Sequence, residues 1–252
     1  MTSLPDTGPN NAVATSLKQE SDQIPNAHPP TPPGLHLQID FSYRKFKNLV
    51  SEKANNTLTP LYAQRFGVLK PQLKYDALAP DGTAPTSIGT GTIMNVSISA
   101  ECTLHGETID LKPLKRWKTQ YNYLSRAFSH SDNGNPVPIT WVTETSLKIW
   151  DWVCINSATQ EPIAKMSVNL WALKQVGNFY FEKTKEELGQ WKRDEVVVTG
   201  LTLLYVMISR INNPLNLVGS MVAKPGKAEG GIETKGVALT VGQHDQAKGK
   251  SV

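Results

Sequence analysis

The stretch DEVVVTGLTLLYVMISRINN, Asp194 to Asn213, contains a long, strongly apolar run without charged residues and decides the fold. The uncharged part, Val196 to Ser209, is fourteen residues long, whereas a transmembrane helix needs about 20 apolar residues. We therefore expect no membrane span here. Asp194 and Glu195 precede the run and Arg210 follows it, which places anions at the positive end and a cation at the negative end of a helix.

Apolar residues in this run cover every side of a helix, and such a helix is buried on all sides. A buried strand also fits the three consecutive valines. The run with its flanking charges is longer than the usual strand of about 4 to 8 residues, which favours a helix. We predict a core helix over about residues 194–212.

Length and charge limit the class of protein. The chain has 252 residues, of which 39% are hydrophobic, and this is enough for a packed core in one main domain. The formal net charge of +4 is well short of the basic excess that indicates nucleic-acid binding. We therefore expect no nucleic-acid partner.

Both ends of the chain have the composition of disordered tails. Seven of the 17 prolines fall before Gly34, with hardly a large apolar residue among them. We predict a disordered proline-rich tail over residues 1–34, a folded domain over 35–222, and a disordered tail rich in Gly and Lys over 223–252. The motif HPPTPPG in the first tail also fits a polyproline segment that a partner recognises.

Between the tails the pattern is mostly period two, which indicates β-strands. Every second residue from Met94 to Leu104 is apolar or small, and this predicts one half-buried strand with Cys102 on its inner face. His105-Gly106 is predicted to be the hairpin turn after this strand, and Gly89 and Gly91 to form a turn before it. Further strands are predicted within residues 61–69, 114–128, 138–156, 162–174 and 177–183, which together form an antiparallel meander.

Four tryptophans on these stretches, Trp141, Trp150, Trp152 and Trp171, are expected to pack against a sheet face. Glu144 and Asp151 are the carboxylates of the tryptophan-rich stretch. Residues seven apart on one undistorted strand face opposite sides, so these two are not expected to act as an acid–base pair.

The sequence offers no common catalytic motif, so we expect a protein that is not an enzyme and holds no cofactor. Cys102 and Cys154 lack metal-ligand spacing and are expected to be reduced core thiols, with no metal site. The first residues contain no apolar block of the kind found in secretory signals. The expected location is therefore the cytoplasm.

A run of hairpin strands followed by one hydrophobic helix, VVVTGLTLLYVMISR, resembles the tubby C-terminal-like superfamily, which includes the tubby and phospholipid scramblase proteins. The resemblance covers about residues 41–213 and implies an antiparallel β-barrel wrapped around a C-terminal hydrophobic helix. The cysteine cluster and acidic calcium segment typical of scramblases are missing, so lipid scrambling is not implied. Tubby-like domains bind phosphoinositide head groups through a basic surface, which implies a similar partner here.

One segment supplies a candidate basic surface. From Leu111 to Ser131 there is no acidic residue. The candidate lipid-binding residues are Lys112, Lys115, Arg116, Lys118, Arg126 and Trp117. Basic side chains near an anionic leaflet contribute about 1 kcal/mol each, and aromatic rings anchor at headgroup depth. An ordinary solvated strand and turn is the alternative, and a second basic group, Tyr43 to Leu49, enlarges the surface only if the fold brings it near.

The main hypothesis is a non-enzymatic, intracellular, membrane-peripheral domain whose basic surface binds an anionic, phosphoinositide-like lipid or a protein partner. The alternative is a β-barrel that holds or acts on a hydrophobic small molecule, with Trp150, Trp152 and Trp171 lining the cavity. A third hypothesis is a scaffold that recruits partners through the proline-rich tail.

Overall fold

The computed structural model describes residues 34–79, 81, 83–94, 98–114, 120–129, 134–145, 150–169 and 174–212. The tails predicted for residues 1–34 and 223–252 lie outside the described residues, except for Gly34. All described residues belong to one compact unit.

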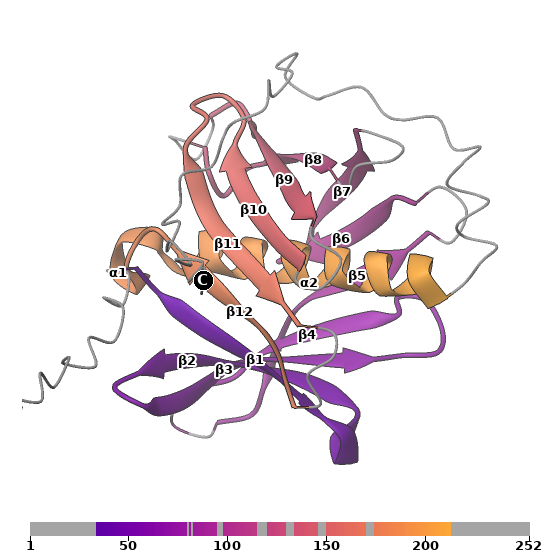
Figure 1. The fold of residues 1–252 in the computed structure, drawn as a ribbon, viewed down its shortest axis with the longest axis vertical. Coiled ribbons are helices and arrows are strands. Elements are labelled where there is room, and N and C mark those ends of the chain that lie inside the picture. The colour runs from indigo at the N-terminus through magenta and orange to yellow at the C-terminus, as the bar shows by residue number, and fades with distance from the viewer. Residues whose placement is uncertain are drawn as a thin grey trace, which may run out of the picture. The chain divides into compact units, whose positions relative to one another are not determined.

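In the described part of the chain, twelve strands form a closed antiparallel barrel (Figure 1). Each strand pairs with the next one in the sequence, and the last strand pairs with the first, with Leu37 opposite Phe179. The strands are β1 (His36–Ser42), β2 (Lys47–Ala54), β3 (Thr57–Phe66), β4 (Leu73–Ala77), β5 (Thr86–Ile93), β6 (Ala100–Leu104), β7 (Glu107–Pro113), β8 (Gln120–Ser125), β9 (Val137–Thr145), β10 (Trp150–Asn156), β11 (Pro162–Val168) and β12 (Gln175–Phe181). A short 3-10 helix, Tyr43–Lys45, joins β1 to β2, and α1 (Lys185–Leu188) and α2 (Gln190–Asn212) follow β12.

Helix α2 lies inside the barrel. Every residue from Val196 to Leu204 is buried, so strands surround this part of the helix on all sides. Its side chains reach strands far apart around the barrel: Thr199 contacts Trp141 of β9, Thr202 contacts Tyr75 of β4, and Tyr205 contacts Asn48 of β2. The predicted mainly β fold with an enclosed C-terminal helix is confirmed (Figure 1).

The apolar run from Val196 to Ser209 is therefore part of a core helix. None of the helices in the described ranges has the length and hydropathy needed to cross a membrane.

In β6, β9 and β10, side chains that were predicted to face the interior are buried. Ala100, Cys102 and Leu104 of β6 are buried, and their neighbours are less so. Cys102 and Cys154 are both free and buried, which confirms the predicted core thiols. Trp141 and Trp152 are buried among the core residues, as expected for rings that pack a sheet.

The single strand predicted from Met94 to Leu104 is wrong at its beginning. β5 ends at Ile93, β6 begins at Ala100, and the Met94 N–H donates to the Ser99 carbonyl across the reversal (3.1 Å). Ile98 lies in the connection between β5 and β6, with a left-handed φ of 55°, but its side chain is buried like those of the strands. The pattern of apolar residues therefore gave no sign that the chain reverses here.

Gly89 and Gly91 lie in β5 and not in the predicted turn. A side chain at Gly91 would place its Cβ 2.7 Å from Thr202 Oγ1 of α2. The glycine is required here because strand and helix approach closely.

The stretch 138–156 forms two strands, with Asp151 of β10 paired to Glu144 of β9 in the antiparallel register. The two residues therefore occupy paired positions on neighbouring strands, and the expectation that they share one strand is wrong. Asp151 forms an ion pair with Lys165 of β11 (2.8 Å). β1, β2, β4 and β5 were not predicted.

We predict that Gly200→Val destabilises the barrel by about 1–3 kcal/mol, the range of overpacked cores. A Cβ at Gly200 would lie 2.9 Å from the Phe179 ring and 3.1 Å from Trp141, and both rings are fully buried in the core. Urea unfolding followed by circular dichroism measures the change. Gly67→Val is the control, because Gly67 is exposed and its Cβ would meet no atom closer than 3.4 Å. Equal stability of the two variants would contradict the close packing of α2.

Candidate functional site

The strands alternate in direction, so their connections alternate between the two ends of the barrel. We call the end at which α2 begins the N-end and the end at which it finishes the C-end. Phe66, at the end of β3, packs on Tyr205 near the end of α2 (ring centroids 4.7 Å apart), which places the β3–β4 connection at the C-end. His105 contacts Asp194 near the beginning of α2, which places the β6–β7 turn at the N-end.

Four of the candidate lipid-binding residues, Lys115, Arg116, Trp117 and Lys118, lie outside the described residues. The residues on either side of them are described: Leu114 donates to the carbonyl of Gln120 (2.8 Å) where β7 and β8 meet at the C-end.

Lys112 and Arg126, the other two candidates, lie at different places along the barrel. Lys112 is the second-last residue of β7, close to the C-end of the barrel, and is partly buried. Arg126 follows β8 at the N-end, where its side chain is 72% exposed and lies 3.5 Å from Glu107. The length of β8, about 3.3 Å per residue, separates Arg126 from the β7–β8 connection. The fold therefore does not bring Arg126 together with the C-end cations.

At the C-end, two connections expose large apolar side chains. We call Tyr43, Phe46, Val68 and Leu69 the exposed tip; their exposed fractions are 64%, 65%, 99% and 82%. Phe46 also packs against Phe66 (5.4 Å between centroids), so the two connections lie side by side. Clustered apolar side chains of this size in water indicate a surface that contacts another phase or molecule.

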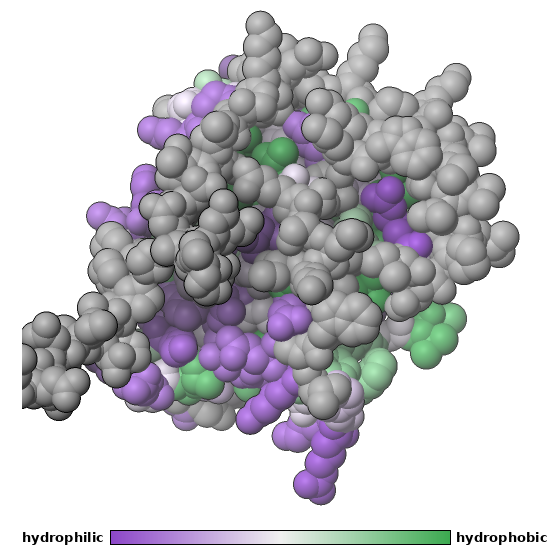
Figure 2. All heavy atoms as spheres, in the orientation of Figure 1, coloured by the Kyte–Doolittle hydropathy of each residue, from purple (hydrophilic) through white to green (hydrophobic). Residues whose placement is uncertain are grey.

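The cations around the exposed tip are Arg44, Lys45, Lys47, Lys70 and Lys74. No Asp or Glu occurs in segments 43–47 and 65–74. Arg65 is neutralised by Asp76 of β4 (2.7 Å). Figure 2 shows hydrophobic atoms exposed at the lower right of the molecule, close to hydrophilic ones. The C-end thus combines apolar and basic side chains.

The second basic group of the sequence, Tyr43 to Leu49, is thereby placed at the same end of the barrel as the β7–β8 connection. The sequence did not reveal the exposure of Val68 and Leu69. One sequence feature could have indicated it: Val68 and Leu69 stand between Gly67 and the Lys70-Pro71 dipeptide, and glycine and proline are typical of connections between strands.

At the N-end, a buried polar network surrounds the first turns of α2. Arg193 Nε donates to Tyr62 Oη (2.6 Å), Tyr62 donates to Asp194 Oδ1 (2.6 Å), and His105 Nε2 lies 3.0 Å from Asp194 Oδ2. The His105 ring stacks on Trp191 (4.9 Å). Burial raises the pKa of Tyr62 well above its usual value, and the Asp194 carboxylate adds to the rise. Tyr62 therefore stays a donor.

This network corrects the predicted role of the acidic pair. α2 begins at Gln190, four residues earlier than predicted, so Asp194 and Glu195 do not cap its first turn. Both are buried inside the barrel instead. The connection before α2 contains the one-turn helix α1, whose capping box joins Thr184 and Glu187.

Glu195 is the unusual ionisable group of the interior. Burial raises its pKa to about 7, and the neighbouring Ser125 hydroxyl opposes this rise only in part. Within the described part of the chain, Glu195 Oε1 and Tyr123 Oη lie buried without a hydrogen-bond partner. Burial also raises the pKa of the Cys154 thiol, and Glu195 adds to that rise. An uncharged Glu195 suits this apolar surrounding better than a carboxylate.

We predict that stability falls as the pH rises from about 4.5 to about 7. In this window the unfolded chain releases the Glu195 proton and the folded chain retains it. The free energy of unfolding then decreases by up to about 1.4 kcal/mol per pH unit from this group. Glu195→Gln should remove this part of the slope, as measured by urea unfolding across the window. Glu186→Gln, on the exposed surface of α1, is the control that keeps it; the same slope in both variants would refute the assignment.

Comparisons of the chain with protein-family models, with curated proteins and with solved structures found no match. The function therefore has to be inferred from the geometry of the two barrel ends.

Proposed function

We propose that this protein is a tubby-like barrel that binds an anionic membrane surface through the C-end. The observation that carries the proposal is the exposed tip with its surrounding cations. The tip inserts into the headgroup region, and the cations stay at the level of the lipid phosphates.

The free energies involved favour a combination of apolar insertion and electrostatic attraction. Full burial of an aliphatic or aromatic side chain contributes about 1.5–3 kcal/mol, and each cation near an anionic leaflet about 1 kcal/mol. A single weak anchor gives only marginal membrane binding, and stable binding needs two kinds of signal. Val68 and Leu69 supply the first kind, and Arg44, Lys45 and Lys70 the second.

The resemblance to tubby-like proteins is supported by the architecture, a closed barrel around the helix that follows its last strand. A phosphoinositide is the anionic lipid that this resemblance favours. The C-end cations lie on several connections, so they suit a headgroup that carries more than one negative charge.

An enclosed hydrophobic ligand is less well supported. The space inside the described barrel is occupied by α2 and by large buried rings such as Trp141, Tyr75 and Phe179. A protein partner with an acidic, apolar surface would suit the same C-end, and the vesicle experiment distinguishes it.

The proposal is tested by co-sedimentation with vesicles of neutral lipid, of phosphatidylserine, or of a phosphoinositide at equal total charge, over a salt series. We expect binding to anionic vesicles that weakens as salt rises. Stronger binding to the phosphoinositide vesicles would support the specific lipid. Absence of binding to every vesicle would overturn the proposal and favour the protein partner.

We predict that Val68→Ser with Leu69→Ser lowers vesicle affinity at least tenfold. The change removes the two most exposed apolar side chains of the tip, each of which contributes about 1.5 kcal/mol or more when buried, and about 1.4 kcal/mol is a tenfold change. Leu58→Ser is the control because Leu58 is also exposed, but it lies on β3 near the N-end. An equal loss in the control would contradict the assignment of the C-end.

Charge reversal tests the electrostatic part separately. We predict that Arg44→Glu with Lys45→Glu removes the preference for anionic over neutral vesicles, and that Lys115→Glu with Arg116→Glu does the same. Arg126→Glu, at the N-end, should leave binding within about twofold of the original protein, because exposed charges more than about 10 Å away are screened. A larger effect at Arg126 than at Lys45 would refute this orientation. Circular dichroism checks that each variant is folded.

A further inference from the structure

The N-end contains a pocket of about 450 Å³ that the proposed membrane contact does not use. Its size is within the range of small-molecule sites, about 300–1,000 Å³. Its lining includes the apolar residues Leu61, Leu78 and Ile88 and the polar residues His105, Gln190 and Arg193. A pocket lined by both kinds of side chain suits an amphipathic ligand.

Arg193 is the charged residue of this pocket that the protein holds most firmly. It is buried to 8% exposure, its Nε donates to Tyr62 Oη (2.6 Å), and its guanidinium lies 5.7 Å from the centre of the Tyr62 ring. Tyr62 is itself fixed by its hydrogen bond to Asp194. The guanidinium therefore keeps one orientation without help from a ligand.

The two terminal nitrogen atoms of the Arg193 guanidinium have N–H groups that are available to a ligand. Among the described residues, Nη1 and Nη2 of Arg193 form no hydrogen bond or ion pair. The carboxylates of this region are engaged elsewhere: Asp194 accepts from Tyr62 and His105, and Glu52 accepts from Lys185 (2.7 Å). Among the described residues, neither nitrogen is a buried atom without a partner, so both are open to the pocket, where an anion or water can meet them.

We propose that this pocket binds a small amphipathic anion, whose carboxylate or phosphate is bound by Arg193 and whose apolar body lies against Leu61, Leu78 and Ile88. Nη1 and Nη2 provide the parallel donors that a carboxylate or a phosphate accepts in bidentate fashion. Gln190, the first residue of α2, also lines the pocket, which places the positive end of the helix beside it.

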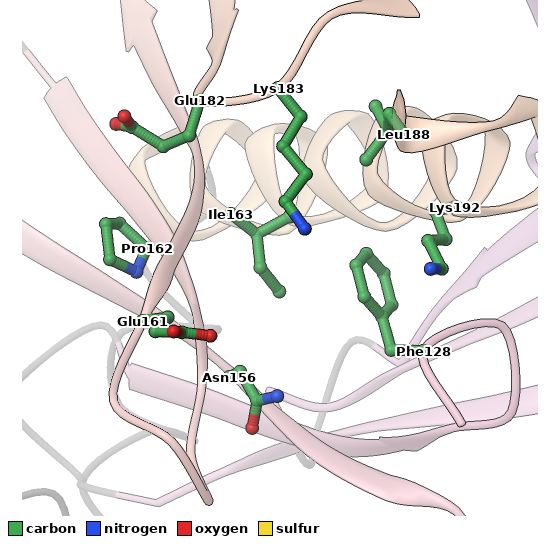
Figure 3. A pocket seen from close by; sticks show the side chains of 9 residues that line it. All are labelled: Phe128, Asn156, Glu161, Pro162, Ile163, Glu182, Lys183, Leu188 and Lys192. Carbon is green, nitrogen blue, oxygen red and sulfur yellow. The ribbon is translucent and has the colours of Figure 1, made fainter. Parts of the chain in front are cut away.

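The second pocket at this end does not fit such a ligand (Figure 3). It holds about 130 Å³, and Lys183 extends between Ile163 and Phe128 into it. Glu161 and Glu182 line the same small space, so the charges are mixed. The larger pocket with Arg193 is therefore the better site.

The test uses the full chain and two matched sets of probes, followed by isothermal titration calorimetry. Octanoate and octyl phosphate carry an anion and an apolar body, octanol lacks the anion, and acetate and inorganic phosphate lack the body. We expect saturable binding of one octanoate or octyl phosphate per chain and at least tenfold weaker binding of the other probes. Binding of octanol as tight as that of octanoate, or no binding of either anionic octyl probe, would overturn the proposal.

Two variants locate the binding. Arg193→Lys keeps the charge and loses the planar fork, and it should lower octanoate affinity at least tenfold. Ala79→Phe should abolish binding by filling the pocket while it leaves Arg193, Tyr62 and Asp194 intact. Ala158→Phe, in an exposed turn that lines neither pocket, should bind as the original protein does. Octanoate binding that survives Ala79→Phe in a folded protein would overturn the assignment, and this outcome is independent of membrane binding at the C-end.

Discussion

The structure depends on one constraint: a helix enclosed by a closed barrel is shielded from water, so its polar groups need partners inside, and Glu195 Oε1 is an exception. Thr199 and Thr202 meet this constraint by donating to the carbonyls of Glu195 and Val198, one turn earlier (2.7 and 2.8 Å). Their oxygens then accept from the strands, Thr199 from Trp141 Nε1 and Thr202 from Cys102 Sγ. These pairings fix the rotation of α2 in the barrel, which apolar contacts alone specify poorly.

The same constraint explains why the two barrel ends differ chemically. At the N-end the helix carries charged residues into the interior, and the barrel supplies Tyr62 and His105 to pair with them. At the C-end the helix presents Tyr205, which extends an aromatic cluster through Phe66 to Phe46 and the surface. The proposed ligands of the two ends differ accordingly: a small amphipathic anion at the N-end and a membrane surface at the C-end.

Sequence patterns predicted the layers of the fold because period two and an all-round apolar helix are direct consequences of burial. They failed where a residue is buried but does not belong to a strand. Ile98 is an example, because it is buried although the chain reverses direction there. Of the sites, the sequence indicated cations near Lys115 and Tyr43, but it grouped Arg126 with them across the length of a strand. It gave no sign of the Arg193 network, because Asp194 and Glu195 also fit the ordinary pattern of helix-capping acids. Only the observed beginning of α2 at Gln190 shows that they are inside.

α2 connects the two ends, and its packing determines whether they can influence each other. The helix has 23 residues, about 35 Å in length, so a ligand at the N-end could affect the C-end only by shifting or rotating it. Allosteric coupling needs an element with two arrangements of similar free energy that both sites bias. A Cβ at Gly200 would crowd Phe179 and Trp141, and a Cβ at Gly91 would crowd Thr202, so the helix packs closely at both positions. A shift of the helix by one residue would bring larger side chains to these positions and break both threonine pairings. We therefore expect α2 to keep one arrangement and the two ends to bind their ligands independently.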